Sequence, residues 1–364
     1  MKIALVVPGF SAHERDWCIP ALLDYVRVLA AQAEVHVFTL RWPERSGSYR
    51  VFNATVHALD GREHLGLSVF GLWARALRAM AAEHRRKPFT TIHAFWADEP
   101  GWVAALAGRR LGVPVIISLA GGELIGMRDI GYGAQLLPGR RALIRWGLRQ
   151  ADRVTTGSKY LLDLTRAYLP QKHWHKLRYA PLGVDTELFS PALTTKRAGE
   201  GQRVTVLNVG SLTPVKDQAT LLRAVTRIPQ AHLRIAGGGP LRVELQRLAG
   251  ELGIANRVEF LGEIDHGQMT AVYGAADLFV QASRHEAQGM AALEAAACGL
   301  PAVGTNVGIL PDIGRCVPVG DVASLAEAIR RTLNEGGASA REKVEADFSL
   351  ARAMEKLFAL YNGE

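Results

Sequence analysis

Cysteine is scarce in this sequence, which holds only Cys18, Cys298 and Cys316 among its 364 residues. Three widely spaced cysteines fit neither a disulfide framework nor the spacing of zinc ligands. The eleven histidines contain no His-x-x-x-His pair, and the single Glu-x-x-His, from Glu263 to His266, has no third ligand nearby in the sequence. We therefore expect a reducing, cytoplasmic setting, no bound metal and no cofactor.

Long apolar runs are also absent. No stretch approaches the roughly 20 residues that a membrane-spanning helix needs, and the apolar start, 3–7, is too short for a secretion signal. A content of 48% hydrophobic and 21% charged residues is typical of a globular protein. A chain of 364 residues is longer than one hydrophobic core usually serves, which predicts two domains.

Acidic residues are too few in the first half of the chain to balance the basic ones. Residues 1–185 hold 25 Lys and Arg against 15 Asp and Glu, whereas the remainder holds 18 against 20. Such a one-sided excess favours an anionic partner, for example a lipid headgroup, a diphosphate-linked lipid or a polyanionic glycan. A merely solvated surface is the alternative. Nucleic acid is not expected, because no recognition motif accompanies the charge.

The basic residues cluster in 139–153, where Arg140, Arg141, Arg145 and Arg149 are interleaved with apolar side chains. On a helix this spacing places a basic flank beside an apolar stripe. The pattern suits peripheral contact of the basic N-terminal domain with a membrane, and it suits equally a helix that docks on its own sheet. Both interpretations remain open at the level of the sequence.

Short β-branched runs alternate with helical patterns along the whole chain, which predicts repeated βαβ units and an α/β fold with mostly parallel sheets. In the first half the predicted strands are Ile3–Val7, Val35–Thr39, Val51–Ala58, Thr91–Phe95, Val115–Leu119, Arg153–Thr156 and Leu177–Ala180. The predicted helices between them are Trp17–Ala31, Leu67–His84, Trp102–Leu111, Gln135–Gln150 and Lys159–Tyr168.

A polar stretch, 194–202, follows Phe189–Pro191 and predicts an exposed linker. Beyond it the predicted strands are Val204–Val209, His232–Ala236, Val258–Leu261, Leu278–Gln281 and Ala302–Val303, with helices at Gln218–Thr226, Leu241–Leu252, Gly267–Gly274, Met290–Ala297 and Leu325–Leu333. We predict domains over 1–187 and 188–345, and a final helix, 346–364, that packs back on the first domain. Ligand sites should lie at the carboxyl ends of the strands, in a cleft between facing domains.

Two glutamates follow the predicted strand Leu278–Gln281. Glu286 falls in the loop, and Glu294 falls inside the next helix, which is otherwise so small and apolar that it should be buried. A lone buried carboxylate is costly unless it binds something, although Glu286 as a helix cap and Glu294 as an ordinary helix charge are the alternatives. The start of this helix also favours an anion. The backbone N–H groups available there belong to Gln288, Gly289 and Met290.

The spacing of Glu286 and Glu294, followed by the sequence 298–301 (Cys-Gly-Leu-Pro), resembles the double-glutamate motif of the family 4 retaining glycosyltransferases, or glycosyl transferases group 1. The resemblance implies the GT-B fold, in which two Rossmann-like parallel-sheet domains face each other across a cleft. It also implies that Glu286 engages hydroxyls of the transferred sugar and that Glu294 binds the ribose hydroxyls of the nucleotide. Two carboxylate oxygens suit two vicinal hydroxyl donors.

Other segments of the second half resemble the same family. Lys216 stands where a lysine binds the donor diphosphate, whereas Ser211 stands where the family usually has an arginine. Gly238 lies in a turn that matches the family's glycine-proline turn, where the backbone approaches a ligand closely. Leu261 lies in the segment that meets the nucleobase. The resemblance thus implies that Lys216 and Glu286 are catalytic and that the other three residues bind the donor.

The first half resembles the family less closely. Ala120 stands where many members have a histidine that helps to hold the sugar, and the glycines and the acid after it are candidates to replace that histidine. His93 and Asp98 lie near the end of another strand, where a core histidine and a helix N-terminal acid are the alternatives. The full set of sugar or acceptor candidates is Gly9, His93, Asp98, Gly121, Gly122 and Glu123.

The resemblance as a whole implies retaining, metal-independent transfer of a sugar, with hexosyl transfer favoured. The donor would be a nucleoside-diphosphate sugar of the UDP or GDP type, and the acceptor an unidentified hydroxyl on a lipid-linked molecule or a glycan. A catalytically weak nucleotide-sugar-binding protein with the same fold is the alternative, because Ser211 and Ala120 depart from the family pattern.

Overall fold

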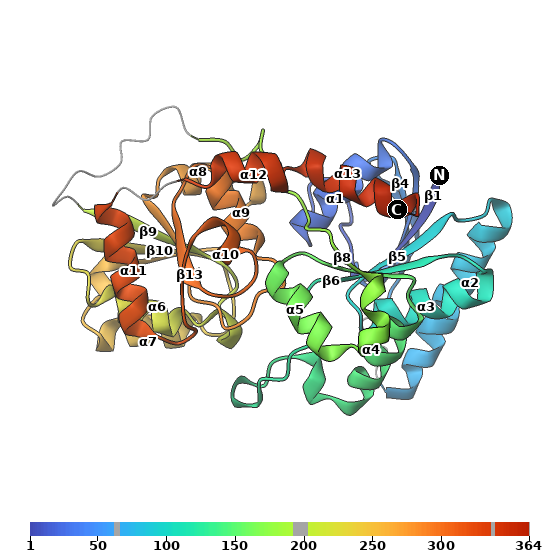
Figure 1. The fold of residues 1–364 in the computed structure, drawn as a ribbon, viewed down its shortest axis with the longest axis horizontal. Helices are drawn as coiled ribbons and strands as arrows, with labels where there is room; N and C mark the ends of the chain where they lie inside the picture. The colour runs from blue at the N-terminus through green and yellow to red at the C-terminus, as the bar shows by residue number, and fades with distance from the viewer. Residues whose placement is uncertain (62–65, 192–202, 336–338, 364) are drawn as a thin grey trace. The chain divides into compact units, whose positions relative to one another are not determined.

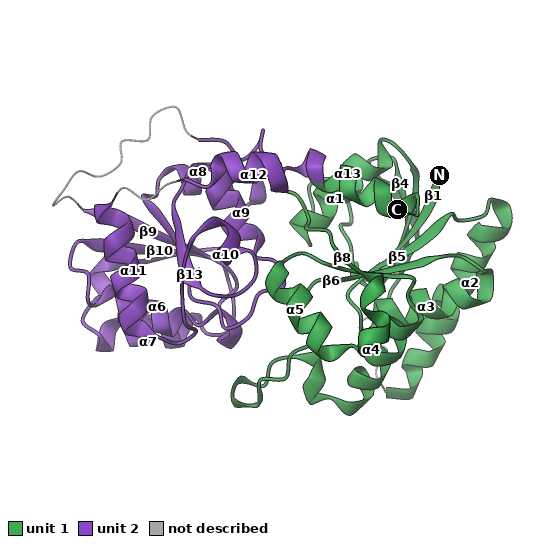
Figure 2. Ribbon diagram, viewed as in Figure 1, with its two compact units in different colours: residues 1–183, 353–364 green, residues 184–352 purple. Residues whose placement is uncertain are grey.

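The computed structural model describes residues 1–61, 66–191, 203–335 and 339–363. The chain divides into two compact units, which Figure 2 colours separately. The first unit comprises residues 1–183 together with 353–364, and the second comprises residues 184–352. The C-terminal segment thus returns to the unit in which the chain begins.

The first unit, whose strands run from blue to green in Figure 1, is built on an eight-stranded sheet with the strand order β3-β4-β2-β1-β5-β6-β7-β8. All neighbouring strands are parallel except β3 and β4, which pair antiparallel. The strands are β1 (Lys2–Gly9), β2 (Glu34–Trp42), β3 (Ser46–Val51), β4 (Ala54–Leu59), β5 (Thr91–Phe95), β6 (Val115–Leu119), β7 (Arg153–Thr156) and β8 (Leu177–Tyr179). The helices are α1 (Pro20–Ala30), α2 (Val69–Arg86), α3 (Glu99–Leu111), α4 (Pro138–Gln150) and α5 (Lys159–Tyr168).

The strand predicted over Val51–Ala58 matches β4 only from residue 54 onwards, because Val51 is the last residue of β3. The structure has a hairpin there, because β3 and β4 are joined by a two-residue turn in which Phe52 adopts a φ of 50°. Helix α4 also begins later than predicted, since Pro138 takes its first position and 134–136 forms a separate 3-10 turn.

The second unit is built on a six-stranded, wholly parallel sheet with the order β11-β10-β9-β12-β13-β14. Its strands are β9 (Val204–Val209), β10 (Ala231–Ala236), β11 (Val258–Gly262), β12 (Leu278–Gln281), β13 (Ala302–Thr305) and β14 (Arg315–Val317). Its helices are α6 (Gln218–Val225), α7 (Arg242–Glu251), α8 (Met269–Gly274), α9 (Met290–Ala297), α10 (Leu310–Ile313), α11 (Val322–Asn334) and α12 (Arg341–Phe348). Two parallel-sheet units confirm the predicted fold class; β14 and the short helix α10 were not predicted.

The last helix, α13 (Leu350–Tyr361), contributes to the core of the first unit. Its residues Met354, Leu357, Leu360 and Tyr361 are buried in the cluster that also holds the central strands β1 and β2. Within the described residues, no helix combines the length and the apolar character that a membrane crossing requires.

Gly108 in α3 shows how tightly the helices of the first unit pack on their sheet. A Cβ atom at this position would lie 2.1 Å from Val115 Cγ2 and 2.8 Å from the carbonyl oxygen of Val113. Gly139 in α4 is the natural contrast, because a Cβ there would meet nothing within 4 Å.

We predict that Gly108→Ala lowers the free energy of unfolding by about 1–3 kcal/mol, because the added methyl group overpacks the contact between α3 and β6. Gly139→Ala should raise it by about 0.4–1 kcal/mol, since alanine restricts the unfolded chain without a clash. Urea unfolding of both variants measures the difference. Equal stability of the two would contradict the close contact at Gly108.

Candidate active site

The loops that follow β9, β10 and β11 are joined to one another at the carboxyl edge of the second sheet. Backbone hydrogen bonds run from Gly210 N to Ala236 O (2.9 Å), from Leu212 N to Gly238 O (2.7 Å) and from Gly237 N to Gly262 O (2.7 Å). Gly237 has a φ of 138°, and a Cβ there would lie 2.1 Å from Gly210 O. Glycine is therefore required for this approach of one loop to the next.

Lys216 and Glu286 meet at this edge although 70 residues separate them. Lys216 ends a 3-10 turn after β9, and its Nζ lies 2.6 Å from Glu286 Oε1 in the loop after β12. Ser283 Oγ donates to the same carboxylate oxygen at 2.7 Å. The side chains of Lys216 and Glu286 are 25% and 12% exposed, so the ion pair is partly accessible. The structure thus brings together both residues predicted to be catalytic, and adds Ser283.

The start of α9 lies directly after this cluster. Gly289 is its N-cap with a φ of 97°, and Gln288 O accepts from Ile309 N at 2.6 Å, which ties the loop to the turn before α10. The N–H groups of the first helical turn have no partner further back along the helix. Together with the helix dipole they make the segment from Gln288 to Met290 suitable for a phosphate oxygen.

Glu294 has a partner within the protein. The hydroxyl of Tyr273, in α8, donates to Glu294 Oε2 at 2.7 Å. Tyr273 is fully buried, and burial, followed by the charge of Glu294, raises its pKa well above the usual value. The carboxylate of Glu294 is therefore not the lone buried group that the sequence suggested, because it is half-buried and hydrogen-bonded. The bond nevertheless fixes one carboxylate oxygen of Glu294.

The remaining donor-binding candidates lie on the same joined loops. Ser211 is exposed, and its carbonyl oxygen accepts from Gln218 Nε2 at 3.1 Å. A Cβ at Gly238 would lie 2.5 Å from Glu263 Oε1, and Leu261 is half-buried near the end of β11. The structure places these residues at the carboxyl ends of β9, β10 and β11, where the fold should bind a ligand.

Glu123 holds together the loops at the ends of β5 and β6 in the first unit. Its side chain is 3% exposed and accepts from the backbone N–H groups of Ala97 (3.2 Å), Ala120 (3.0 Å) and Gly121 (2.6 Å). Burial raises its pKa, and the hydrogen bonds from the backbone oppose that rise. These contacts favour a positioning role for Glu123.

The neighbouring glycines are enclosed by aromatic side chains. A Cβ at Gly121 would lie 3.0 Å from Trp96 Nε1, and one at Gly122 would lie 2.9 Å from the ring of Tyr132. Trp96 itself has a φ of 70°, a strained conformation for a residue with a side chain, and such strain gathers at functional sites.

Asp98 is half-buried, and burial raises its pKa while the charge of Arg140 opposes the rise. Gly9, at the end of β1, would bring a Cβ within 3.1 Å of Trp42 Cβ. Gly9, Asp98, Gly121 and Gly122 therefore all lie at the carboxyl ends of the strands of the first sheet and remain acceptor-side candidates.

His93 lies in the core rather than at an accessible surface. It is 0% exposed, and its ring nitrogens lie 2.7 Å from Tyr361 Oη and 2.7 Å from Ser118 Oγ. Burial lowers the pKa of His93 from 6.5 to about 3, so its ring is neutral at physiological pH. This geometry favours the core-histidine alternative.

Sequence reasoning missed two residues that the structure places at the donor-side site. Ser283 lies in the segment that carries the first glutamate, so the motif contained the signal. Tyr273 lies 21 residues before its partner Glu294, and nothing local in the sequence marks it.

Comparison with known proteins agrees with this architecture. A family model described as "Glycosyl transferases group 1" matches residues 194–347, and one described as "Glycosyltransferase Family 4" matches residues 21–188. The GDP-mannose-dependent alpha-(1-6)-phosphatidylinositol monomannoside mannosyltransferase of Mycobacterium tuberculosis is 30% identical over 319 residues, which are 79% of this chain and 79% of that protein. Its namesake from Mycolicibacterium smegmatis is 31% identical over 66% of this chain and 63% of its own length.

Solved structures with the same fold cover the whole chain. Sucrose-phosphate synthase from Thermosynechococcus elongatus superposes with a TM-score of 0.80 at 24% identity, covering 100% of this chain and 98% of that one. HepE of Anabaena, in complex with UDP and glucose, superposes with a TM-score of 0.77 at 19% identity, covering 100% of both chains.

The fold and the site together define a glycosyltransferase of the GT-B type. This chain belongs to glycosyltransferase family 4, and it is a retaining enzyme that takes its sugar from a nucleotide-sugar donor.

The buried position of His93 predicts a dependence of stability on pH. The pKa of His93 is about 3 in the folded protein against 6.5 for a free histidine, so the unfolded chain binds the proton first. The free energy of unfolding should therefore fall as the pH drops from about 6.5 towards 3, by up to about 1.4 kcal/mol per pH unit for this group. Above pH 6.5 the contribution should be constant.

We predict that His93→Gln makes urea unfolding less dependent on pH across this window. His13→Gln serves as the control, because His13 is exposed. Identical pH profiles for wild type and His93→Gln would show that His93 is accessible to protons in the folded state.

Proposed function

We propose that this enzyme transfers a hexose from a GDP- or UDP-sugar to a hydroxyl of a lipid-linked acceptor at the cytoplasmic face of a membrane. The donor half of the proposal rests on the contact of Lys216 with Glu286 beside the start of α9. The acceptor half rests on the basic first unit and on the relatives. One is named for a phosphatidylinositol mannoside acceptor, and the D-inositol 3-phosphate glycosyltransferase of Mycolicibacterium smegmatis is 38% identical over 50% of this chain and 46% of that protein.

The ion pair suggests an order of events at the donor site. Without donor, Lys216 neutralises Glu286. A diphosphate carries more negative charge than one carboxylate, so it should draw the Lys216 ammonium group towards itself. Glu286, still bonded to Ser283, is then available to accept hydrogen bonds from sugar hydroxyls.

Stabilisation of the departing diphosphate should carry much of the catalysis. Positioned cations and N–H groups act on charge that develops as the bond between sugar and phosphate breaks. We assign this role to Lys216, the Ser211 hydroxyl and the backbone N–H groups from Gln288 to Met290. Glu294, held by Tyr273, would bind the ribose hydroxyls through its carboxylate oxygens, each of which can accept more than one hydrogen bond.

We predict that replacing Glu294 mainly affects nucleotide binding, whereas replacing Glu286 mainly affects turnover. Glu294→Ala should weaken nucleotide binding roughly 10- to 100-fold, the range for hydrogen bonds to a charged group. Glu286→Ala should leave nucleotide binding within about threefold, because it also frees Lys216, and should lower turnover by about 100- to 1,000-fold. Calorimetric titration with UDP, GDP and ADP, followed by donor-hydrolysis assays, measures both quantities and identifies the base.

Tyr273→Phe is the matched control for Glu294, since it removes one hydrogen-bond donor and keeps the ring. It should weaken nucleotide binding less than Glu294→Ala does. Small, equal effects of Glu286→Ala and Glu294→Ala on binding and on rate would refute the assignment. Absence of donor hydrolysis by the wild type would favour a protein that binds the nucleotide sugar without transferring the sugar.

Removal of divalent metals should leave turnover unchanged, because Lys216 and backbone N–H groups occupy the role that a metal has in other transferases. Within the described ranges, no group of three or more His, Cys, Asp or Glu side chains could hold a metal ion. Donor hydrolysis measured with and without EDTA tests this prediction. Strong inhibition that added Mg²⁺ or Mn²⁺ reverses would contradict it.

A further inference from the structure

Helix α4 docks on its own unit and still exposes its basic flank. Ile144, Gly147 and Leu148 are buried, and a Cβ at Gly147 would lie 3.5 Å from the backbone of Gly101 in α3. The arginines on the other flank are exposed. The two interpretations of this helix are therefore compatible, because its apolar stripe contacts the protein and its basic flank is available to a partner.

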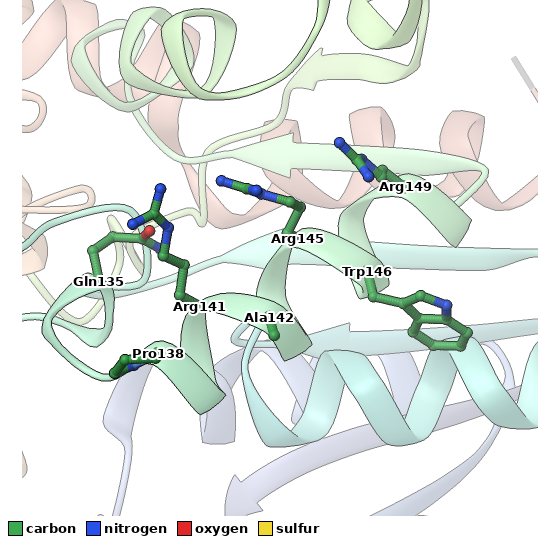
Figure 3. A pocket seen from close by; sticks show the side chains of 7 residues that line it. All are labelled: Gln135, Pro138, Arg141, Ala142, Arg145, Trp146 and Arg149. Atoms are coloured by element: carbon green, nitrogen blue, oxygen red, sulfur yellow. The ribbon is translucent and has the colours of Figure 1, made fainter.

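Arg141, Arg145 and Arg149 line a surface pocket of about 350 Å³, which we call the arginine groove (Figure 3). Their spacing of four residues places them on successive turns of α4, over about 12 Å of the helix axis. Figure 3 shows their side chains projecting from those turns, with Gln135, Pro138, Ala142 and Trp146 completing the lining. Three guanidinium groups in a row match a row of phosphate groups.

Few acids lie near these arginines in the sequence. Residues 138–178 hold ten Lys and Arg but two acids, Asp152 and Asp163. Asp152 accepts from Val115 N at 2.8 Å, and Asp163 pairs with Arg166 at 3.1 Å. In the part of the chain that the structure describes, no ion pair involves Arg141, Arg145 or Arg149. By contrast, helical arginines elsewhere, such as Arg247, pair with an acid.

Exposed apolar side chains flank both ends of the groove. Leu137, directly before α4, is 51% exposed. Trp174 is 41% exposed, and it lies in the 3-10 turn Gln171–Lys176. Lys176 Nζ donates to Arg149 O at 2.9 Å, which places this turn beside the end of α4.

The polar atom of Trp174 is already satisfied inside the protein. Its indole N–H donates to the carbonyl oxygens of Arg166 and Leu169, each at 3.1 Å. The exposed part of the ring is therefore hydrocarbon. Tryptophan and leucine beside a basic row are typical of surfaces that contact a membrane interface, whereas a water-soluble polyanion would need the arginines alone.

We propose that the arginine groove, with Leu137 and Trp174 at its ends, binds the anionic phospholipid headgroups of a bilayer. This inference deepens the proposed function, since it names the surface through which an enzyme with a lipid-linked acceptor reaches its membrane. The guanidinium groups bind phosphate oxygens, and the two apolar side chains enter the headgroup region.

Vesicle co-sedimentation of the full chain tests the proposal. Wild type should bind vesicles of phosphatidylcholine with phosphatidylglycerol, bind pure phosphatidylcholine much more weakly, and dissociate as salt is raised. The triple variant Arg141→Gln, Arg145→Gln, Arg149→Gln should bind the anionic vesicles on the order of 100-fold more weakly, since each basic residue near the surface contributes about fivefold. Trp174→Ala should weaken binding to the same vesicles.

The matched control removes the same charge from another part of the first unit. Arg78 and Arg110 line a second pocket, of about 280 Å³, and Arg85 is exposed on α2. The variant Arg78→Gln, Arg85→Gln, Arg110→Gln should bind anionic vesicles within about threefold of wild type. An equal loss in both triple variants would show a dependence on net charge alone and would overturn the assignment to the groove.

Two further outcomes would overturn the proposal. One is undiminished vesicle binding by the groove variant. The other is binding of heparin, but not of vesicles, that depends on the three arginines, because that result would assign the groove to a soluble polyanion. Donor hydrolysis without vesicles should be unchanged in both triple variants, which shows that they are folded. If the wild type does not hydrolyse the donor, that result would contradict the proposed function. It would not affect the assignment of the arginine groove, which depends on vesicle binding.

Discussion

The ion pair between Lys216 and Glu286 is the contact on which the geometry of the donor side depends. It joins the loop after β9 to the loop after β12, and Ser283 adds a second donor to the same carboxylate oxygen. Ser283 O in turn accepts from Thr305 Oγ1 at 2.5 Å, which links the cluster to the end of β13. A pair that is partly buried contributes little net stability, because desolvation offsets much of the attraction. Its importance lies in position: it holds a cation and a carboxylate ready at the edge where a parallel sheet binds its ligand.

The sequence predicted well what depends on local pattern. Runs such as Thr91–Phe95 and Val204–Val209 are strands with the predicted bounds, because a strand buried on both faces needs a continuous apolar segment. The hairpin was missed because its two-residue turn holds Phe52, an apolar residue with a φ of 50°, and the single asparagine Asn53, without a glycine or proline to mark the break. The partner of Glu294 could not be predicted either, since the bond from Tyr273 exists only once α8 packs beside α9.

The acceptor side shows why residue type alone is a weak guide to chemistry. His93 and Glu123 are the kinds of residue that catalyse reactions, yet both are buried and bonded within the protein. Glu123 stabilises a turn by accepting three backbone N–H groups, and His93 connects Tyr361 of the last helix to Ser118 of β6. Glycines at 121 and 122 permit that turn, because aromatic side chains leave no room for a Cβ. The sequence identifies these residues, but only the structure shows their hydrogen-bond partners.

The basic residues of the first unit also differ in whether their donors are bonded within the protein. Lys2 is charged but nearly inaccessible, since its Nζ donates to the carbonyl oxygens of Glu83 and Lys87 and lies near two acids. Arg41 is held by both carboxylate oxygens of Glu99. Such residues contribute to net charge and to folding, but their donors are already used. The arginines of α4 are exposed, and the acids nearest in sequence bond elsewhere. A basic residue is therefore available to an anionic partner only if the fold does not already use its N–H donors. The basic excess of the first half indicates a binding surface only after the internally bonded residues are set apart from the exposed ones.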